Sequence, residues 1–307
     1  MESMNFVFGH KKPDTDSVAS AISMANLQSN IGNYSESFIL GEVNRETEFA
    51  LKSFDIKKPQ LIEKVNKNDN VIMVDSNEFT QSVEGIEDAN IKMIVDHHRL
   101  NLQTNNPVFC MAEPVGCTST ILYKLYKQND IDIKPEMAGI MLSAIISDTL
   151  LFKSPTCTEQ DEFIASKLSD IAGVDMYDYG YRLLKAGTNL EGYTAKQIIN
   201  IDAKVFEKNN IKINISQVNS ADVESVLSKQ KELEQAIENE ILLNKIDCYI
   251  FLVTDILNAS SRALVLGNRR DIFEKAYNTK LCNNTAILEG VVSRKKQVLP
   301  KILDSIN

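Results

Sequence analysis

Short apolar runs alternate along the first part of the chain with longer segments of helical spacing. Residues 5–9, 71–75 and 91–96 form compact apolar runs typical of buried strands. Apolar residues recur at helical spacing in five further segments, namely 17–30, 115–129, 135–146, 159–171 and 176–184. Strands that alternate with helices indicate βαβ units. The pattern therefore predicts an α/β protein whose first domain has a mainly parallel sheet flanked by helices.

The pattern breaks around residues 186–192, where small and polar residues replace the apolar periodicity. We place a linker near 187–193, which predicts one domain over 1–187 and another over 188–307. The second segment has strand-like runs at 211–216, 248–254 and 262–267, and a long polar helix pattern at 223–243. A smaller α/β domain is the expectation for this segment.

The composition of the chain excludes several classes of protein. The chain has 307 residues and a net charge of −9, which argues against a general nucleic-acid binder. No apolar run approaches the ~18–20 residues that span a bilayer, and the first residues lack the pattern of a secretory signal. The five cysteines show no C-x-x-C spacing, so a cytoplasmic protein with reduced thiols is expected. Neither G-x-G nor G-K-[ST] occurs, which excludes a dinucleotide fingerprint and a Walker loop.

Charge is divided unevenly between the two predicted domains. Residues 1–187 hold 17 Lys and Arg against 27 Asp and Glu, whereas residues 188–307 hold 16 against 15. An acidic domain suits cation binding, and the nearly neutral one has basic residues near its C-terminal end.

All three histidines lie in two clusters at predicted strand ends. The first cluster has His10 with Asp14 and Asp16, and the second has His97 and His98 after an aspartate. Open α/β sheets bind ligands at the carboxyl ends of their strands. Asp14 or Asp16 could equally cap the following helix. Because alternate side chains of a strand face opposite sides, we expect His97 and His98 to face different parts of the site.

Two further aspartates fit a metal site. Asp75 closes a predicted strand, and Asp148 lies in an apolar segment where burial would require a partner. Taken alone, Asp75 could cap a turn and Asp148 could end a helix in solvent. With His10, Asp14, Asp16 and His97 they give two imidazoles and four carboxylates, too many for one ion. Such mixed ligands suit Mn²⁺ or Co²⁺, with Mg²⁺ as a third option, in a two-metal site for phosphoryl hydrolysis.

Three consecutive cations, Arg294, Lys295 and Lys296, follow an apolar run near the C-terminus. Such a run is usually a solvated edge. Opposite a metal site, however, arginine and lysine become candidate phosphate ligands.

At these residues the chain resembles the DHH phosphoesterase superfamily and, within it, the family II (manganese-dependent) inorganic pyrophosphatases. The first five matching stretches lie in residues 10–17, 74–75, 96–99, 112–118 and 143–148. Two more lie at 151–158 and 293–297, so the resemblance spans nearly the whole chain. The S-R-K-K-Q stretch at 293–297 narrows it to pyrophosphatases. One departure is Ser76, where the family commonly has histidine.

The resemblance implies a DHH catalytic domain, a DHHA2-type substrate-binding domain, and hydrolysis of pyrophosphate between them by an inorganic diphosphatase that is a homodimer. It places one Mn²⁺ on His10, Asp14, Asp75 and Asp148. The second Mn²⁺ would lie on Asp16, Asp75, His97 and Asp148. A further Mg²⁺ or Mn²⁺ would arrive with the substrate. His98, Lys204, Arg294 and Lys295 match catalytic positions that bind the phosphates, and His98 is the best candidate for proton donor.

Two alternatives stay open on the sequence alone. An exopolyphosphatase or another DHH-type phosphoesterase would keep the metal chemistry and change the substrate. A non-catalytic binding module would retain a dead site, but none of the six ligand positions is lost.

Overall fold

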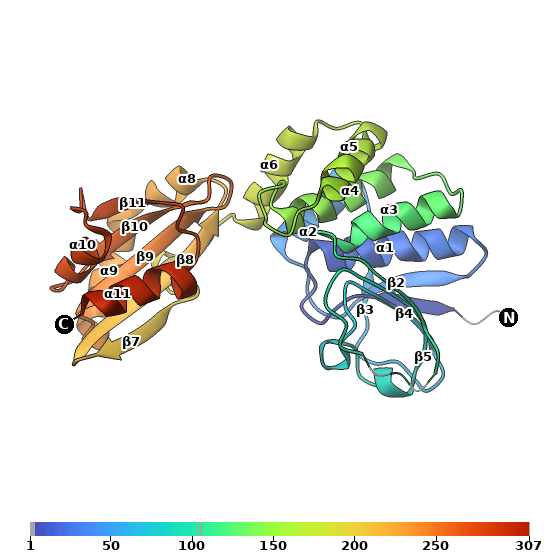
Figure 1. Cartoon of the computed structure of the whole chain (residues 1–307), viewed down its shortest axis with the longest axis horizontal. Coiled ribbons are helices and arrows are strands. Elements are labelled where there is room, and N and C mark those ends of the chain that lie inside the picture. Colours follow the sequence, from blue (N-terminus) through green and yellow to red (C-terminus); the bar gives the residue numbers. More distant parts are fainter. Residues whose placement is uncertain (1–3, 103, 105, 307) are drawn as a thin grey trace. The chain divides into compact units, whose positions relative to one another are not determined.

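Parallel strand pairing dominates the first of two units into which the chain divides, Met1–Gly187 and Thr188–Asn307 (Figure 1). The computed structural model describes residues 4–102, 104 and 106–306. Within these residues, six strands of the first unit pair in the order β3-β2-β1-β4-β5-β6, and every pair is parallel. The strands are β1 (Asn5–Phe8), β2 (Ser35–Ile39), β3 (Gln60–Leu61), β4 (Asn70–Val74), β5 (Asn90–Asp96) and β6 (Phe109–Ala112).

The strand order reverses between β1 and β4, because the chain adds β2 and β3 on one side of β1 and then returns to add β4 to β6 on the other. Loops that leave the carboxyl ends of two such strands diverge, and the crevice between them is where open α/β sheets bind ligands. Both strands are buried and apolar, with Phe8 and Met73 fully inaccessible in one core cluster.

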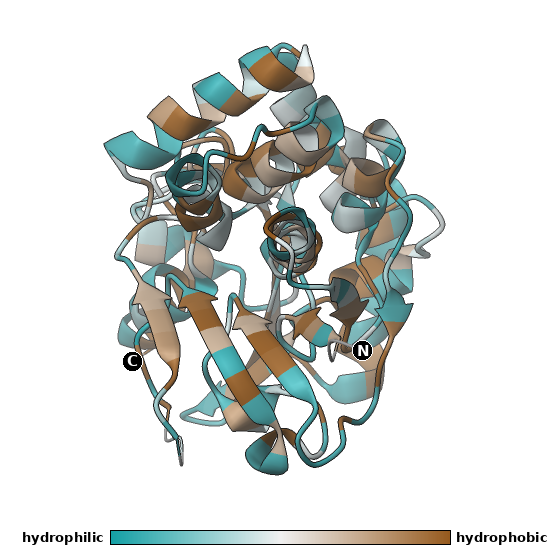
Figure 2. Ribbon diagram, turned by 90° about the vertical axis from the view of Figure 1, so that its right-hand side faces the viewer, coloured by the Kyte–Doolittle hydropathy of each residue, from teal (hydrophilic) through white to brown (hydrophobic). Residues whose placement is uncertain are grey.

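The helices of the first unit are α1 (Thr15–Asn30), α2 (Arg45–Ser53), α3 (Thr118–Gln128), α4 (Pro135–Thr149), α5 (Glu159–Ala172) and α6 (Met176–Gly187), with 3-10 turns η1 (Phe79–Gln81) and η2 (Ile86–Asp88). Helix α1 is buried along most of its length and packs against α3, α4 and the sheet. Figure 2 shows hydrophobic positions along the strands and polar positions in the loops that join them. Of the described helices, none combines the length and the apolar character needed to cross a membrane.

The second unit has a mixed sheet in the order β11-β10-β9-β8-β7, in which only β8 and β9 pair in parallel. Its strands are β7 (Lys204–Lys208), β8 (Ile211–Ser220), β9 (Cys248–Asp255), β10 (Ser260–Leu266) and β11 (Thr285–Glu289). Its helices are α7 (Ala195–Ile199), α8 (Val223–Leu227), α9 (Gln230–Asn244), α10 (Asp271–Tyr277) and α11 (Leu299–Ser305), with a π-helical turn η3 (Arg294–Val298). Two separate apolar clusters form its core, and alternate residues of β9 enter one or the other.

The fold class predicted from the sequence is confirmed, but several elements differ from the predicted runs. The helix predicted over 223–243 is two helices, because Lys229 leaves helical geometry (φ −95°, ψ 19°) between α8 and α9. Five strands lie outside the runs predicted from the pattern, namely β2, β3, β6, β7 and β11, and all of them except β2 are at a sheet edge. Helices α2, α7, α10 and α11 were not predicted either. Edge strands are solvated, so their residues lack the continuous apolar character of buried strands; β3 and β6 have no fully buried residue.

Candidate metal centre

The candidate ligands lie at the carboxyl ends of three neighbouring strands. His10 follows β1, Asp75 comes directly after β4, and His97 and His98 come directly after β5. Strand β4 pairs with both β1 and β5, so these loops are adjacent. They flank the point at which the strand order reverses.

One group contains His10, Asp14 and Asp75, whose potential ligand atoms all lie within 4.8 Å of one another. His10 Nε2 is 3.6 Å from Asp14 Oδ2 and 3.5 Å from Asp75 Oδ2. The other oxygen of Asp14 accepts a hydrogen bond from Ser17 N at 3.0 Å and caps α1. The helix cap and the candidate metal ligand, which the sequence left as alternatives, are therefore the same residue.

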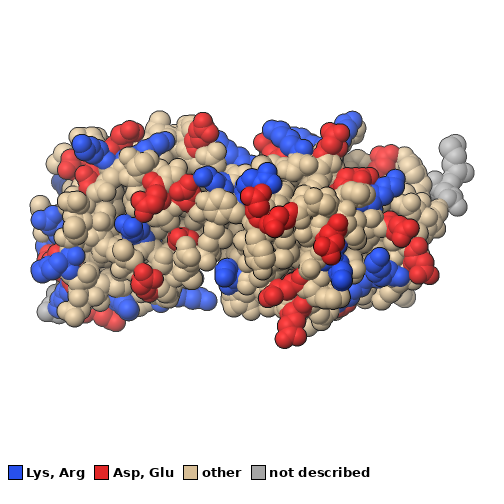
Figure 3. Space-filling model, turned by 90° about the horizontal axis from the view of Figure 1, so that it is seen from above, with Lys and Arg blue, Asp and Glu red and all other residues tan. Residues whose placement is uncertain are grey.

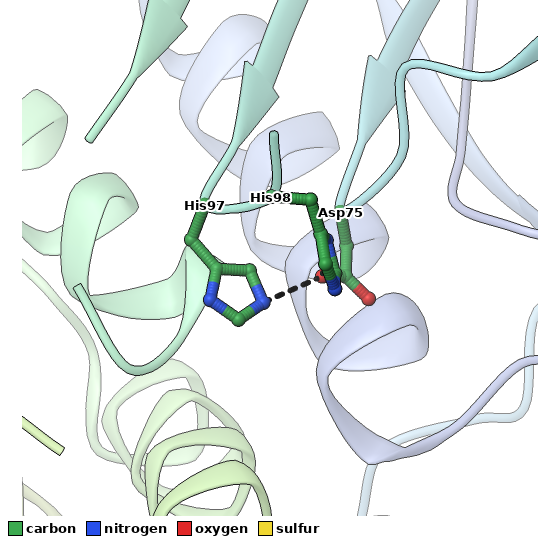
Figure 4. A group of neighbouring side chains, drawn as sticks. All are labelled: Asp75, His97 and His98. Atoms are coloured by element: carbon green, nitrogen blue, oxygen red, sulfur yellow. Dashed lines mark ion pairs between the residues drawn. The ribbon is translucent and has the colours of Figure 1, made fainter. Parts of the chain in front are cut away.

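A second group contains Asp16, Asp75, His97 and Asp148, again with all potential ligand atoms within 4.8 Å. His97 Nε2 is 3.4 Å from Asp75 Oδ1 and 3.6 Å from Asp148 Oδ2, and its ring nitrogen points at Asp75 in Figure 4. Asp75 thus presents one oxygen to each group. In the described residues Asp148 joins the second group only, whereas the resemblance assigns it to both ions.

Hydrogen bonds fix the buried carboxylates. Asp16 is fully buried and accepts from Ser20 Oγ and Thr118 N, each at 2.7 Å, and from Ser119 Oγ at 3.1 Å. Thr118 Oγ1 donates to Asp75 Oδ1 at 3.1 Å. Asp75 has a left-handed backbone (φ +53°), a conformation that aspartate tolerates better than most residues.

His97 has a defined orientation as well. Its Nδ1 lies 3.1 Å from the carbonyl oxygen of Val115. When Nδ1–H donates to that carbonyl, Nε2 carries the lone pair and faces the carboxylates, which is the usual arrangement of a metal-binding histidine.

His98 contradicts one expectation. Strand β5 ends at Asp96, so the backbone turns before the histidines, and the two rings lie 4.2 Å apart. Both rings reach Asp75 Oδ1, with His98 Nδ1 at 3.7 Å (Figure 4), so the prediction that they face different parts of the site is wrong. His98 Nδ1 is 2.9 Å from Asp96 Oδ1, and Asn77 Nδ2 donates to the other oxygen of Asp96. His98 borders a cavity of about 220 Å³ that Asp75 also lines.

The electrostatics of the cluster follow from its crowding. Burial alone would lower the pKa of His10, but Asp14 and Asp75 raise it to about 10. Burial also opposes charge on His97, whose pKa is nevertheless raised to about 9 by Asp75 and Asp16. Burial, followed by the charges of Asp16 and Asp75, raises the pKa of Asp148 well above its usual value. The cluster therefore retains positive charge, as protons, among its carboxylates.

The residues fit a divalent ion in place of those protons. These two groups, and a third that Asp75 forms with His97 and His98, offer only carboxylate oxygens and imidazole nitrogens. That is the donor set of Mn²⁺ and related ions and not of thiolate-seeking metals. Fixed hydrogen bonds to Asp16, Asp75 and His97 hold these donors in place.

The predicted cations lie in the second unit. Arg294 begins η3, and its side chain is only 9% exposed. Its Nη2 donates to Asp202 Oδ1 at 3.0 Å, and its Nη1 donates to the carbonyl oxygen of Ile215 at 3.5 Å. Lys204 begins β7 and, like Lys295, is exposed. Asp202 thus connects the Ile201–Lys204 stretch to the S-R-K-K-Q stretch.

Glutamine side chains shape the turn that carries Arg294. Gln297 Oε1 accepts from the backbone N–H groups of Val292 and Ser293, and its Nε2 donates to Gly290 O at 2.7 Å. Gln217 on β8 accepts from Arg294 N at 2.9 Å. The final glutamine of the S-R-K-K-Q stretch therefore has a structural role.

Sequence reasoning did not single out Thr118, Asp202 or Gln217. Thr118 lies inside the 112–118 stretch that carried the resemblance, and Asp202 lies two residues before the matching position Lys204, so their position was a usable signal. Gln217 lies inside a strand, and nothing in the pattern indicates it.

Comparison with known proteins finds two family domains in this chain. The family described as "DHH family, N-terminal domain" matches residues 5–145, and the DHHA2 domain matches residues 181–305. A Bacillus cereus protein named as a probable manganese-dependent inorganic pyrophosphatase is 51% identical over 97% of both chains. The chain belongs to the manganese-dependent inorganic pyrophosphatases. A Shouchella clausii protein of the same name is 50% identical over 98% of this chain and 97% of its own.

Solved structures agree with membership of the manganese-dependent inorganic pyrophosphatases. A Methanococcus jannaschii crystal structure assigned to the family II inorganic pyrophosphatases is 41% identical, with a TM-score of 0.64. It covers 98% of this chain and 99% of the other. An exopolyphosphatase-related protein from Bacteroides fragilis shares the fold, at 15% identity and a TM-score of 0.52 over 99% of this chain and 92% of its own.

Proposed function

We propose that this chain hydrolyses inorganic pyrophosphate to two orthophosphates, with two Mn²⁺ ions held by the two ligand groups. The observation that carries the proposal is Asp75, whose two carboxylate oxygens face two different sets of nitrogen and oxygen donors. The names of relatives that match 97% of the chain at about half identity support the substrate and the metal.

His10, Asp14 and Asp75 would hold one ion, and Asp16, Asp75, His97 and Asp148 the other. The proposal includes three further points. Asp148 lies within reach of both ions, and Co²⁺ or Mg²⁺ can substitute for Mn²⁺. A further Mg²⁺ or Mn²⁺ enters with the substrate. When bound, divalent ions at a two-metal site supply Lewis acidity to the attacking water and to the phosphoryl oxygens.

The chain's own residues handle substrate charge and protons. Arg294 presents a planar fork suited to two phosphate oxygens, and Asp202 and Ile215 O hold that fork in place. Lys204 and Lys295 add point charges for the same phosphates. His98 gives a proton to the leaving phosphate from Nε2, because its Nδ1 is engaged by Asp96.

The test is phosphate release by the purified full chain. Metal-free protein is reloaded with Mn²⁺, its metal content is measured, and pyrophosphate is added. We expect turnover in the loaded protein and a collapse of turnover in Asp148→Asn. Absence of phosphate release from protein that holds two Mn²⁺ would contradict the proposal.

The second candidate function is that of an exopolyphosphatase, since an exopolyphosphatase-related protein shares the fold. The same assay with tripolyphosphate and longer chains decides between them. We expect pyrophosphate to be hydrolysed with the highest kcat/KM. Nucleic acid is not an expected partner, and acidic and basic side chains are interspersed over the face shown in Figure 3.

We further propose a homodimer in the cytoplasm. Strand β6 lies at the edge of the first sheet and exposes Phe109 by 53%, a surface suited to a second copy of the chain. All five cysteines are free thiols, as in a reducing compartment. Light scattering of the wild type and of Phe109→Asp tests the dimer.

A further inference from the structure

Asp161 is a buried carboxylate outside both ligand groups. It lies in the first turn of α5, has no exposed surface, and receives four hydrogen bonds. Its Oδ2 accepts from Gly116 N at 2.8 Å, Thr158 N at 2.8 Å and Thr158 Oγ1 at 2.6 Å, while its Oδ1 accepts from Thr120 Oγ1 at 2.6 Å. Two of these four donor groups belong to Thr158, the N-cap of α5, and the other two belong to Gly116 and Thr120 at the start of α3.

The contact with Gly116 is closely fitted. A Cβ atom at Gly116 would lie 2.8 Å from Asp161 Oδ2 and 2.8 Å from Thr149 Cγ2. The backbone of this segment is therefore held directly against Asp161, with no room for a side chain between them.

The segment that Asp161 holds, residues 115–119, contacts three ligands of the second group. Val115 O receives His97 Nδ1, and Thr118 N and Ser119 Oγ donate to Asp16. Thr118 Oγ1 donates to Asp75. Gly116 lies between these contacts, so a shift of its backbone would move an imidazole and a buried carboxylate together.

The first group depends on this segment much less. Among the described residues, its link to residues 115–119 is the hydrogen bond from Thr118 to the shared Asp75, whereas Asp14 is held by the N-terminus of α1. Partners that orient metal ligands typically change metal affinity about 10- to 100-fold when removed. That loss should fall on one ion and not on both.

We propose that Asp161 is a positioning residue for the second group, Asp16, Asp75, His97 and Asp148, and acts through residues 115–119. The inference rests on the proposed function, because it assumes that this group binds Mn²⁺. According to this proposal, a carboxylate outside both ligand groups sets the affinity for one of two neighbouring ions and not for the other.

The experiment measures Mn²⁺ affinity by calorimetry in the full-length chain, in two backgrounds that isolate the groups. Asp14→Asn removes a ligand of the first group only, and Asp16→Asn removes a ligand of the second group only. Adding Asp161→Ala should weaken the remaining site at least about tenfold in the Asp14→Asn background. In the Asp16→Asn background the remaining affinity should change less than about threefold, because fewer contacts connect that group to the segment.

Thr158→Val is the matched control, because it removes a donor to Asp161 on the α5 side and leaves Gly116 and Thr120 in place. It should lower the unfolding temperature of the metal-free protein without changing either Mn²⁺ affinity. Thr120→Val removes a donor on the α3 side and should reproduce the selective loss at smaller amplitude, which keeps the test decisive if Asp161→Ala does not fold.

The outcomes separate the two levels of inference. If the wild type binds no Mn²⁺, the proposed function itself fails. If the wild type binds two ions and Asp161→Ala or Thr120→Val lowers the unfolding temperature with both affinities intact, Asp161 is only a structural residue. An equal loss at both sites would also overturn the proposal.

Discussion

The acidic cluster of the first unit and the cationic turn of the second, residues 294–298, differ in how their buried charges are neutralised. Asp16 and Asp75 are almost completely buried, and like charges crowd each other until protons or metal ions neutralise them. Arg294 is nearly as buried, but its charge is already matched by Asp202 and a backbone carbonyl. The charges of the acidic cluster are thus neutralised only by the protons or ions that it binds. The charge of Arg294, in contrast, already has a partner before substrate arrives. Substitutions should therefore affect metal binding in one unit and substrate binding in the other.

The largest expected effect is at Asp75, the residue shared by both groups. Asp75→Asn removes a charge from each group, so Mn²⁺ affinity and turnover should both fall more than about 100-fold. Asparagine tolerates the left-handed backbone of this position, so the fold should persist. Calorimetry and phosphate release measure the two effects, with Asp170→Asn, an exposed carboxylate on α5, as the control. Retention of both ions by Asp75→Asn would remove the basis of the comparison.

Arg294→Lys tests the cationic turn of the second unit. It keeps the charge but loses the planar fork, so kcat/KM for pyrophosphate should fall about 10- to 100-fold while Mn²⁺ affinity stays unchanged. Lys296→Ala, in the same turn, should behave as the wild type in both assays. A loss of Mn²⁺ affinity in Arg294→Lys would show that the two regions are not separable.

pH should act on the first unit alone. The raised pKa values of His10 (about 10) and His97 (about 9) keep both imidazoles protonated at pH 7 until Mn²⁺ displaces the protons. Affinity should therefore rise with pH up to about 9 at the second group and about 10 at the first, and weaken about tenfold per site for each unit of acidification below those values. Calorimetry in two buffers of different ionisation enthalpy measures the released protons, and identical heats would contradict the assignment.

The smallest effect is expected at Asp202. Its side chain is 55% exposed, so water screens its pair with Arg294 even though that arginine is 9% exposed, and screened pairs contribute about 0.2–1 kcal/mol. Asp202→Asn should raise the KM for pyrophosphate only about 2- to 5-fold and leave kcat and Mn²⁺ affinity unchanged. A larger fall in kcat would mean that Asp202 acts on more than the orientation of Arg294.

Much of this site was predictable because its ligands share one simple rule. His10, Asp75 and His97 come at the ends of apolar runs, and the ends of neighbouring parallel strands meet in space. The rule fails where geometry depends on distant partners. Asp161 contacts Gly116 across 45 positions, and Thr118 contacts Asp16 across 102, so no local pattern reveals either. The orientation of His98 was missed for a smaller reason, since β5 ends one residue before the histidines begin.

The distribution of the ligands along the chain has a consequence for synthesis. Because a chain emerges from the ribosome with its N-terminus first, the donors between His10 and Asp148 cannot all assemble until about half of the protein has been made. The cationic turn at 294–298 is among the last segments to emerge. A chain that terminates before residue 294 should therefore still acquire manganese while lacking its arginine clamp.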